Sequence, residues 1–143
     1  MEINFFTEDI ESPELNKSII TEWLSSIVKD HKYEIQDLNY IFCSDDYLHK
    51  INVEYLDHDD LTDIITFDNS ETPNTIEADI FISIERVKEN ASNFKVSFHD
   101  ELHRVLVHGL LHLLGFGDKT NDQKDIMRKN EDACLSLLSN LDK

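Results

Sequence analysis

The chain has 143 residues and a formal net charge of −17, with 30% charged and 40% hydrophobic residues. This length and composition are ordinary for a globular protein and allow one core without disulfide staples, so we expect a single domain over residues 1–143. A negative charge of this size repels phosphate backbones at long range. Composition alone therefore argues against a nucleic-acid-binding protein.

The N-terminal segment and the cysteines indicate the compartment. Residues 1–9 are acidic and lack the basic region that opens a signal peptide. No apolar run reaches the roughly 18 residues that a membrane span needs. Cys43 and Cys134 are too few for a disulfide framework and lack metal-site spacing, so we expect two free thiols in a reducing compartment. These features predict a cytoplasmic protein.

The first half of the chain predicts strands that alternate with helices. A strand is expected over residues 1–6, followed by a helix of about 16 residues that Ser12 caps and Pro13 opens. Residues 33–43 contain the apolar and aromatic side chains of a second strand. Ser44 suits the N-cap of a second helix.

Two adjacent strands are expected in the middle of the chain. Residues 63–67 are rich in β-branched side chains, and residues 77–83 alternate between apolar and polar side chains. Ser83 suits the N-cap of a third helix. The spacing of Ser97 and Asp100 resembles a capping box and predicts a fourth helix.

The helix that follows Ser97 is apolar on almost every side, which predicts that it lies at the centre of the protein. Gly115 can end this helix in a left-handed conformation. Thr120 and Gln123 have the spacing of a second capping box and predict a C-terminal helix. Together these elements predict a layered α/β (α+β) fold, with a small, mixed, mostly parallel four-stranded sheet packed with about five helices. The pattern does not determine the strand order.

One segment of the central buried helix carries the residues of a metal site. His108 and His112 lie four residues apart, so a helix places both imidazoles on one face, where they can bind one ion. A third ligand is needed, and Gly115 and Gly117 allow a sharp turn that can bring Asp118 back to the same ion. Two histidines and a carboxylate suit one zinc ion per chain, and also nickel, cobalt or iron.

A second interpretation of the two histidines stays open, in which each is buried in a leucine-rich helix and bonded to a neighbour. An unpartnered polar group there costs roughly 1–3 kcal/mol, which favours a metal as a shared partner. Gly109 lies between the histidines, and glycine inside a helix costs about 1 kcal/mol relative to alanine. We interpret Gly109 as room for the close approach of a ligand.

Gly109 also limits the chemistry. Metalloproteases with this histidine spacing carry glutamate after the first histidine as general base, and this chain has glycine there. Hydrolysis must therefore use water that the bound metal acidifies, or a carboxylate from elsewhere in the chain. Asp63 and Asp79 are the catalytic candidates by sequence, although a hydrated carboxylate at a strand end accounts for each equally well.

Two weaker patterns could also bind cations. His99 and His103 are four residues apart on the same predicted helix, but solvent exposure near the helix start is the preferred interpretation. The acidic segment 57–60 could bind a cation, yet a hydrated loop is the simpler interpretation.

Residues 108–118 read His-Gly-Leu-Leu-His-Leu-Leu-Gly-Phe-Gly-Asp, which resembles the signature of the YbeY family of bacterial rRNA maturation factors. Residues 51–67 and 78–83 are similar to two further segments of that family. The resemblance implies a single-strand-specific metallo-endoribonuclease that acts in late maturation of the 3′ end of small-subunit rRNA and in ribosome quality control. It implies zinc bound through His108, His112 and Asp118, where the family usually has a third histidine at the last position.

The resemblance also implies partners, namely rRNA in the small ribosomal subunit, with ribosomal proteins or an assembly GTPase as further candidates. Leu56 stands where the family commonly has an arginine that is thought to serve RNA handling. This departure and the negative charge keep a second hypothesis open, a ribosome-assembly binding factor with a structural metal and no nuclease activity. A third is a hydrolase of another small or peptide substrate, to which Gly109 is the objection.

Overall fold

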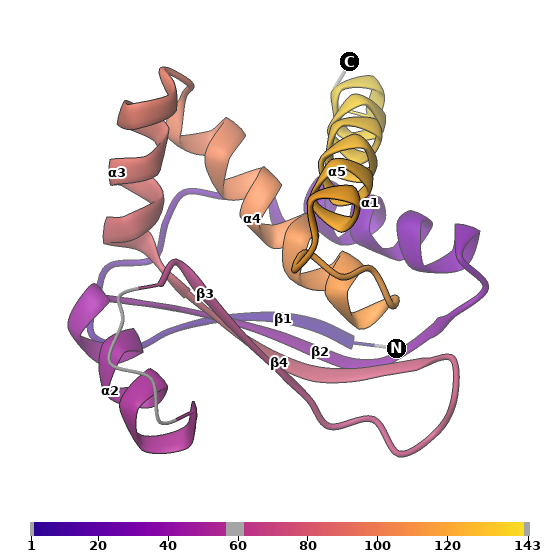
Figure 1. Cartoon of the computed structure of the whole chain (residues 1–143), viewed down its shortest axis with the longest axis horizontal. Coiled ribbons are helices and arrows are strands. Elements are labelled where there is room, and N and C mark those ends of the chain that lie inside the picture. Colours follow the sequence, from indigo (N-terminus) through magenta and orange to yellow (C-terminus); the bar gives the residue numbers. More distant parts are fainter. Residues whose placement is uncertain (1, 57–61, 142–143) are drawn as a thin grey trace.

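The computed structural model describes residues 2–56 and 62–141, and these form four strands and five helices (Figure 1). In chain order they are β1 (Glu2–Thr7), α1 (Lys17–Asp30), β2 (Glu34–Cys43), α2 (Asp45–Leu56), β3 (Ile64–Asp68), β4 (Thr75–Ser83), α3 (Ile84–Phe94), α4 (Phe98–Leu113) and α5 (Asn121–Leu141). The predicted fold class is confirmed. Among these helices, none is long and apolar enough to cross a membrane.

The strand order, which the sequence left undetermined, is β1-β2-β4-β3. β1, β2 and β4 are parallel, and β3 runs antiparallel to β4. The register places Leu38 beside Ile3 on one side and beside Ala78 on the other, and Thr66 opposite Ile80. In the described part of the chain, β1 and β3 are therefore the two edges of the sheet.

Helices cover the two faces of the sheet unequally. Figure 1 shows α1, α4 and α5 above the sheet and α2 below it. The upper layer holds most of the core, where the Trp23 indole N–H donates to the Cys134 carbonyl at 2.7 Å and the Tyr40 hydroxyl donates to the Leu106 carbonyl at 2.9 Å. A smaller apolar cluster between α2 and the sheet joins Leu48 to Ile65 of β3.

Most of the predicted helix starts are confirmed. The side chains that accept a hydrogen bond from the first turn are Ser44, Ser83, Ser97 and Thr120. The predicted cap at Ser12 is wrong, because α1 begins at Lys17 and the Asn16 side chain accepts from the Ile19 N–H at 3.2 Å. Leu15 is apolar because it packs against the core from the connection before the helix. Its position happens to fit the apolar spacing of the helix, which led to the wrong start.

Gly109 has a different purpose from the one the sequence suggested. A Cβ atom at this position would lie 2.9 Å from Cδ1 of Ile64 and 3.0 Å from Cδ1 of Ile80. The glycine therefore lets α4 lie directly on β3 and β4, and the interpretation as room for a ligand is wrong. This contact fixes how far His108, the next residue back, stands from the sheet.

Replacing Gly109 with alanine should destabilise the protein by about 1 kcal/mol. Overpacking a dense layer costs about 1–3 kcal/mol, and alanine gains roughly 1 kcal/mol in helix propensity, so the middle of the range leaves a net loss. Urea denaturation measures the free energy of unfolding. Adding Ile64→Val removes the clashing Cδ1 atom and should recover part of the loss, whereas strictly additive effects of the two substitutions would show that this contact is not the cause.

Candidate metal centre

The end of α4 turns the chain back on itself. Gly115 has a positive φ of 104°, its N–H donates to the His112 carbonyl at 3.0 Å, and the Phe116 N–H donates to the Leu111 carbonyl at 3.0 Å. This pair of bonds is a Schellman ending, which the sequence predicted at this glycine. The reversal brings the following residues, including Asp118, back toward the histidine face of α4.

The structure brings the three predicted ligands together. The Nε2 atoms of His108 and His112 are 3.0 Å apart, and Oδ2 of Asp118 lies 3.5 Å from the first and 3.3 Å from the second. Ligand atoms on one tetrahedral zinc ion at about 2.05 Å are about 3.3 Å apart. The three atoms therefore have the spacing of one face of such a tetrahedron, and the fourth corner is left for another group. In the described residues, this is the group of side chains whose geometry could hold a metal ion.

A glutamate that the sequence patterns did not single out orients the first histidine. Oε2 of Glu131, on α5, lies 2.6 Å from Nδ1 of His108, and its Oε1 accepts from Nη1 of Arg104 at 2.9 Å. Nη2 of Arg104 donates to Asp132 at 2.7 Å. A carboxylate at Nδ1 keeps the proton on that nitrogen, so the Nε2 lone pair of His108 points at the centre.

Charge and burial act against each other in this pair. Burial lowers the pKa of His108, but the hydrogen bond and charge of Glu131 outweigh it and raise the pKa overall, with Asp118 adding to the effect. Burial raises the pKa of Glu131, but the hydrogen bonds from His108 and Arg104 outweigh it and lower the pKa overall. Glu131 is therefore ionised at neutral pH. The proton that it holds is on Nδ1 of His108, not on the atom that faces a metal.

The sequence did contain a signal for this glutamate. The buried positions of α5 repeat at helical spacing and are Met127, Glu131, Cys134 and Leu138. An acidic residue in an apolar stripe needs a partner, because burying an unpaired charge is costly. The stripe alone could not identify His108 as that partner, since the pairing of α4 with α5 is a long-range contact.

The two catalytic candidates lie on opposite faces of the sheet. Asp63 precedes β3 and lines a cavity of about 210 Å³ with His108 and Glu131. Burial raises its pKa, and the charges of His108 and Arg86 oppose that rise. Asp79 accepts from Asn39 at 3.0 Å and alternates with Ile80, which faces α4, so it points away from the histidines.

The histidines of the weaker cation pattern contact other parts of the protein. Nε2 of His99 is 2.9 Å from the Glu14 carbonyl oxygen, and the His103 ring packs edge-on to Trp23 with a centroid distance of 6.1 Å. Both cysteines are buried free thiols, as expected. The acidic segment 57–60 lies outside the described residues.

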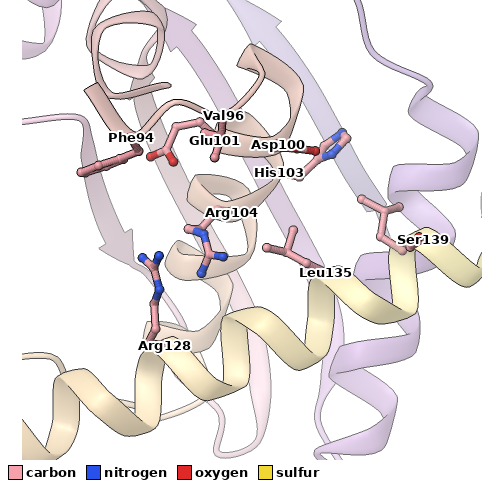
Figure 2. A pocket seen from close by; sticks show the side chains of 10 residues that line it. Phe94, Val96, Asp100, Glu101, His103, Arg104, Arg128, Leu135 and Ser139 are labelled. Atoms are coloured by element: carbon pink, nitrogen blue, oxygen red, sulfur yellow. The ribbon is translucent and has the colours of Figure 1, made fainter. Parts of the chain in front are cut away.

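A second cavity of about 420 Å³ lies between α4, α5 and the end of α3. Figure 2 shows Arg128 extending from α5 toward Arg104 of α4, with Glu101 above them. Burial raises the pKa of Glu101, and the charge of Asp63 adds to this rise. The cavity carries acidic as well as basic groups, and Arg104 is already bound to two carboxylates. It is therefore not a strongly cationic site.

Comparisons with known proteins match nearly the whole chain to one family. The family model described as "Endoribonuclease YbeY" matches residues 2–139. The chain is 57% identical over 135 residues to "Endoribonuclease YbeY" of Cytophaga hutchinsonii, covering 94% of each chain. It is 50% identical over 122 residues to the protein of that name in Flavobacterium johnsoniae, covering 85% of this chain and 87% of the other. The solution structure of TM1509 from Thermotoga maritima matches with a TM-score of 0.66 at 25% identity, over 97% of this chain and 93% of that one.

Replacing Glu131 with glutamine should weaken zinc binding by about 10- to 100-fold, because the histidine loses the charged partner that orients it. Competition with a chromophoric chelator measures the affinity. Asp132→Asn is the matched control, since Asp132 pairs with the same arginine but has a 58% exposed side chain. Equal zinc affinities of the two variants would show that Glu131 does not orient His108.

Proposed function

The chain belongs to the YbeY endoribonuclease family, and on this premise we propose that it hydrolyses single-stranded rRNA with one divalent ion held by His108, His112 and Asp118. The observation that carries the proposal is the triangle of ligand atoms, with edges of 3.0, 3.3 and 3.5 Å. Cleavage of RNA needs a group that stabilises the negative charge that develops on the phosphate during the reaction. A divalent ion is such a group.

We propose zinc as the ion, since two imidazole nitrogens and one carboxylate oxygen are ligands that zinc accepts in a tetrahedral site. Zinc bound there would supply Lewis-acid stabilisation of the phosphate and would acidify a water molecule. Asp118 carries a negative charge at the position where the family usually has histidine. That charge lowers the net positive charge of the centre relative to a site of three histidines.

The chain's own residues supply orientation and proton transfer. Glu131, held by Arg104, fixes the ring and tautomer of His108. Asp63 faces the same cavity as His108, and burial raises the pKa of its carboxyl, which makes the carboxylate a better acceptor for a proton from the attacking water. We propose Asp63 rather than Asp79 as that acceptor, because Asp79 lies on the other face of the sheet.

The biological setting is proposed from the resemblance. The protein would act as a single cytoplasmic domain in late maturation of the 3′ end of small-subunit rRNA and in ribosome quality control. Ribosomal proteins or an assembly GTPase would be its partners, and a net charge of −17 suits contact with basic ribosomal proteins.

Purified protein should contain about one zinc ion per chain and cleave single-stranded rRNA, and His112→Ala should lose both properties because two ligands cannot hold the ion. Asp118→Ala should lose zinc as well, whereas Asp118→His, which provides another zinc ligand, should keep it. Elemental analysis and cleavage of end-labelled RNA give the two readouts. Robust cleavage by fully metal-free protein would end the proposal. Zinc binding without any cleavage would support the assembly-factor hypothesis.

Asp63→Asn should lower kcat about 100-fold with little change in KM, because amide nitrogen cannot accept the proton. In the wild type, kcat should rise as pH increases through the pKa of Asp63, since a base acts only when deprotonated. That rise should be absent in the variant. Asp79→Asn should leave kcat and its pH profile unchanged, and a loss of kcat as large as that of Asp63→Asn would refute the assignment.

A further inference from the structure

Four aromatic side chains line a groove between α2 and the strands β3 and β4. We call this the aromatic groove; its rings are those of Tyr47, Tyr55, Phe67 and Phe81, it has a volume of about 480 Å³, and Lys50 stands on its wall. Tyr47 stacks on Phe81 with centroids 6.5 Å apart, and Phe67 meets Phe81 edge-on at 5.8 Å. Tyr55 meets Phe67 edge-on at 6.1 Å and is 69% exposed. The rings thus form one continuous row that ends at the surface.

The aromatic groove and the metal centre lie on either side of one edge strand. Ile64 of β3 contacts Gly109 beside His108, whereas Phe67, three positions on, points to the opposite face. Asp63, directly before β3, lines one cavity together with His108. In the described chain no strand pairs with the outer side of β3. A single strand of RNA could therefore pass around β3 from one face to the other.

Charge decides what kind of RNA contact this protein needs. It has 13 basic and 30 acidic residues. Arg86 is paired with Asp45 at 3.0 Å and Glu89 at 3.1 Å, and Arg104 is held by Glu131 and Asp132. The cavity of Figure 2 is lined by acidic as well as basic side chains, so it does not supply the positive charge that an RNA backbone would need. Two arginines are thus held by carboxylates in a protein with a large excess of acidic residues, and stacking of bases on aromatic rings is an RNA contact that needs no cation.

We propose that the aromatic groove binds a nucleobase of the single-stranded RNA substrate by stacking, at a nucleotide farther along the strand than the two that flank the cleaved phosphate. Tyr55 presents the exposed ring and Phe67 supports it, whereas Lys50 and Glu54 place one charge of each sign on the wall of the groove. The inference rests on the proposed function for the identity of the ligand. It adds a binding site on the face of the sheet opposite the metal.

The test measures RNA binding separately from RNA cleavage. Fluorescence anisotropy would follow a labelled single-stranded RNA bound to the His112→Ala protein, which we expect not to cleave it. The RNA is used intact and with one abasic nucleotide placed at each position in turn. Tyr55→Ala is compared with Phe6→Ala, a control on the opposite edge strand whose ring is 50% exposed.

Tyr55→Ala should weaken RNA binding about tenfold, and the dependence of affinity on salt should stay the same because no phosphate contact is lost. One abasic position should cause a similar loss in the parent protein but no further loss in Tyr55→Ala, since both changes remove the same contact. Phe6→Ala should have no effect. Tyr55→Trp should keep the affinity, and RNA should quench its fluorescence, which is separable from that of the fully buried Trp23.

Equal effects of Tyr55→Ala and Phe6→Ala, or additive losses with every abasic RNA, would overturn the inference. Unchanged RNA binding by Tyr55→Ala would also overturn it and would indicate that the groove docks another class of partner, such as a protein. If wild-type protein cleaves RNA but Tyr55 has no effect, this inference alone fails. If the non-additive loss is found but zinc-loaded wild type never cleaves, the proposed function fails and the stacking site stands.

Discussion

The close approach of α4 to the sheet at Gly109 is the constraint on which the rest of the site depends. Because Gly109 has no Cβ, the terminal methyl groups of Ile64 and Ile80 pack directly against the backbone of the helix. The next residue back, His108, is thereby placed beside Asp63 at the start of β3. A glycine that costs helix stability locally is thus retained for a tertiary contact, and that contact brings a ligand from a helix and a carboxylate from a strand into one cavity.

The second constraint is that Arg104 is used to hold carboxylates within the protein. Arg104 neutralises Glu131, and Glu131 in turn fixes His108, so one of the arginines near the centre is committed to building the site. A buried carboxylate between a guanidinium and an imidazole is stable only because both oxygens are bonded. The arrangement gives a rigid ligand geometry on α4 but leaves Arg104 few free donors for a phosphate. The three side chains are therefore held at a spacing that could hold a metal ion, while the charge of Arg104 is used within the protein.

Sequence patterns were sufficient where the interactions are local. Caps at Ser44 and Ser83, the ending at Gly115 and the facing histidines all depend on neighbours within a few residues, and they appear in the structure. The long-range features were not readable. The strand order, the reason for Gly109 and the partner of His108 depend on which elements pack together, which periodicity does not specify. The error at Ser12 has the same origin. Leu15 packs against the core from outside the helix, but its position in the sequence fits the apolar spacing of a helical turn.

The acidic composition argues against an RNA partner, whereas the family cleaves RNA. The two can be reconciled because net charge and contacts in the site act over different distances. A charge of −17 governs the approach of RNA from solution, where repulsion weakens beyond about 8–10 Å at physiological salt. Contacts inside the site act over a few ångströms, where a bound cation and aromatic rings attract a nucleotide regardless of the distant field. Composition therefore argues against an RNA partner only if affinity depends on many phosphate contacts. An acidic protein can bind RNA when one ion and one stacked base define the register.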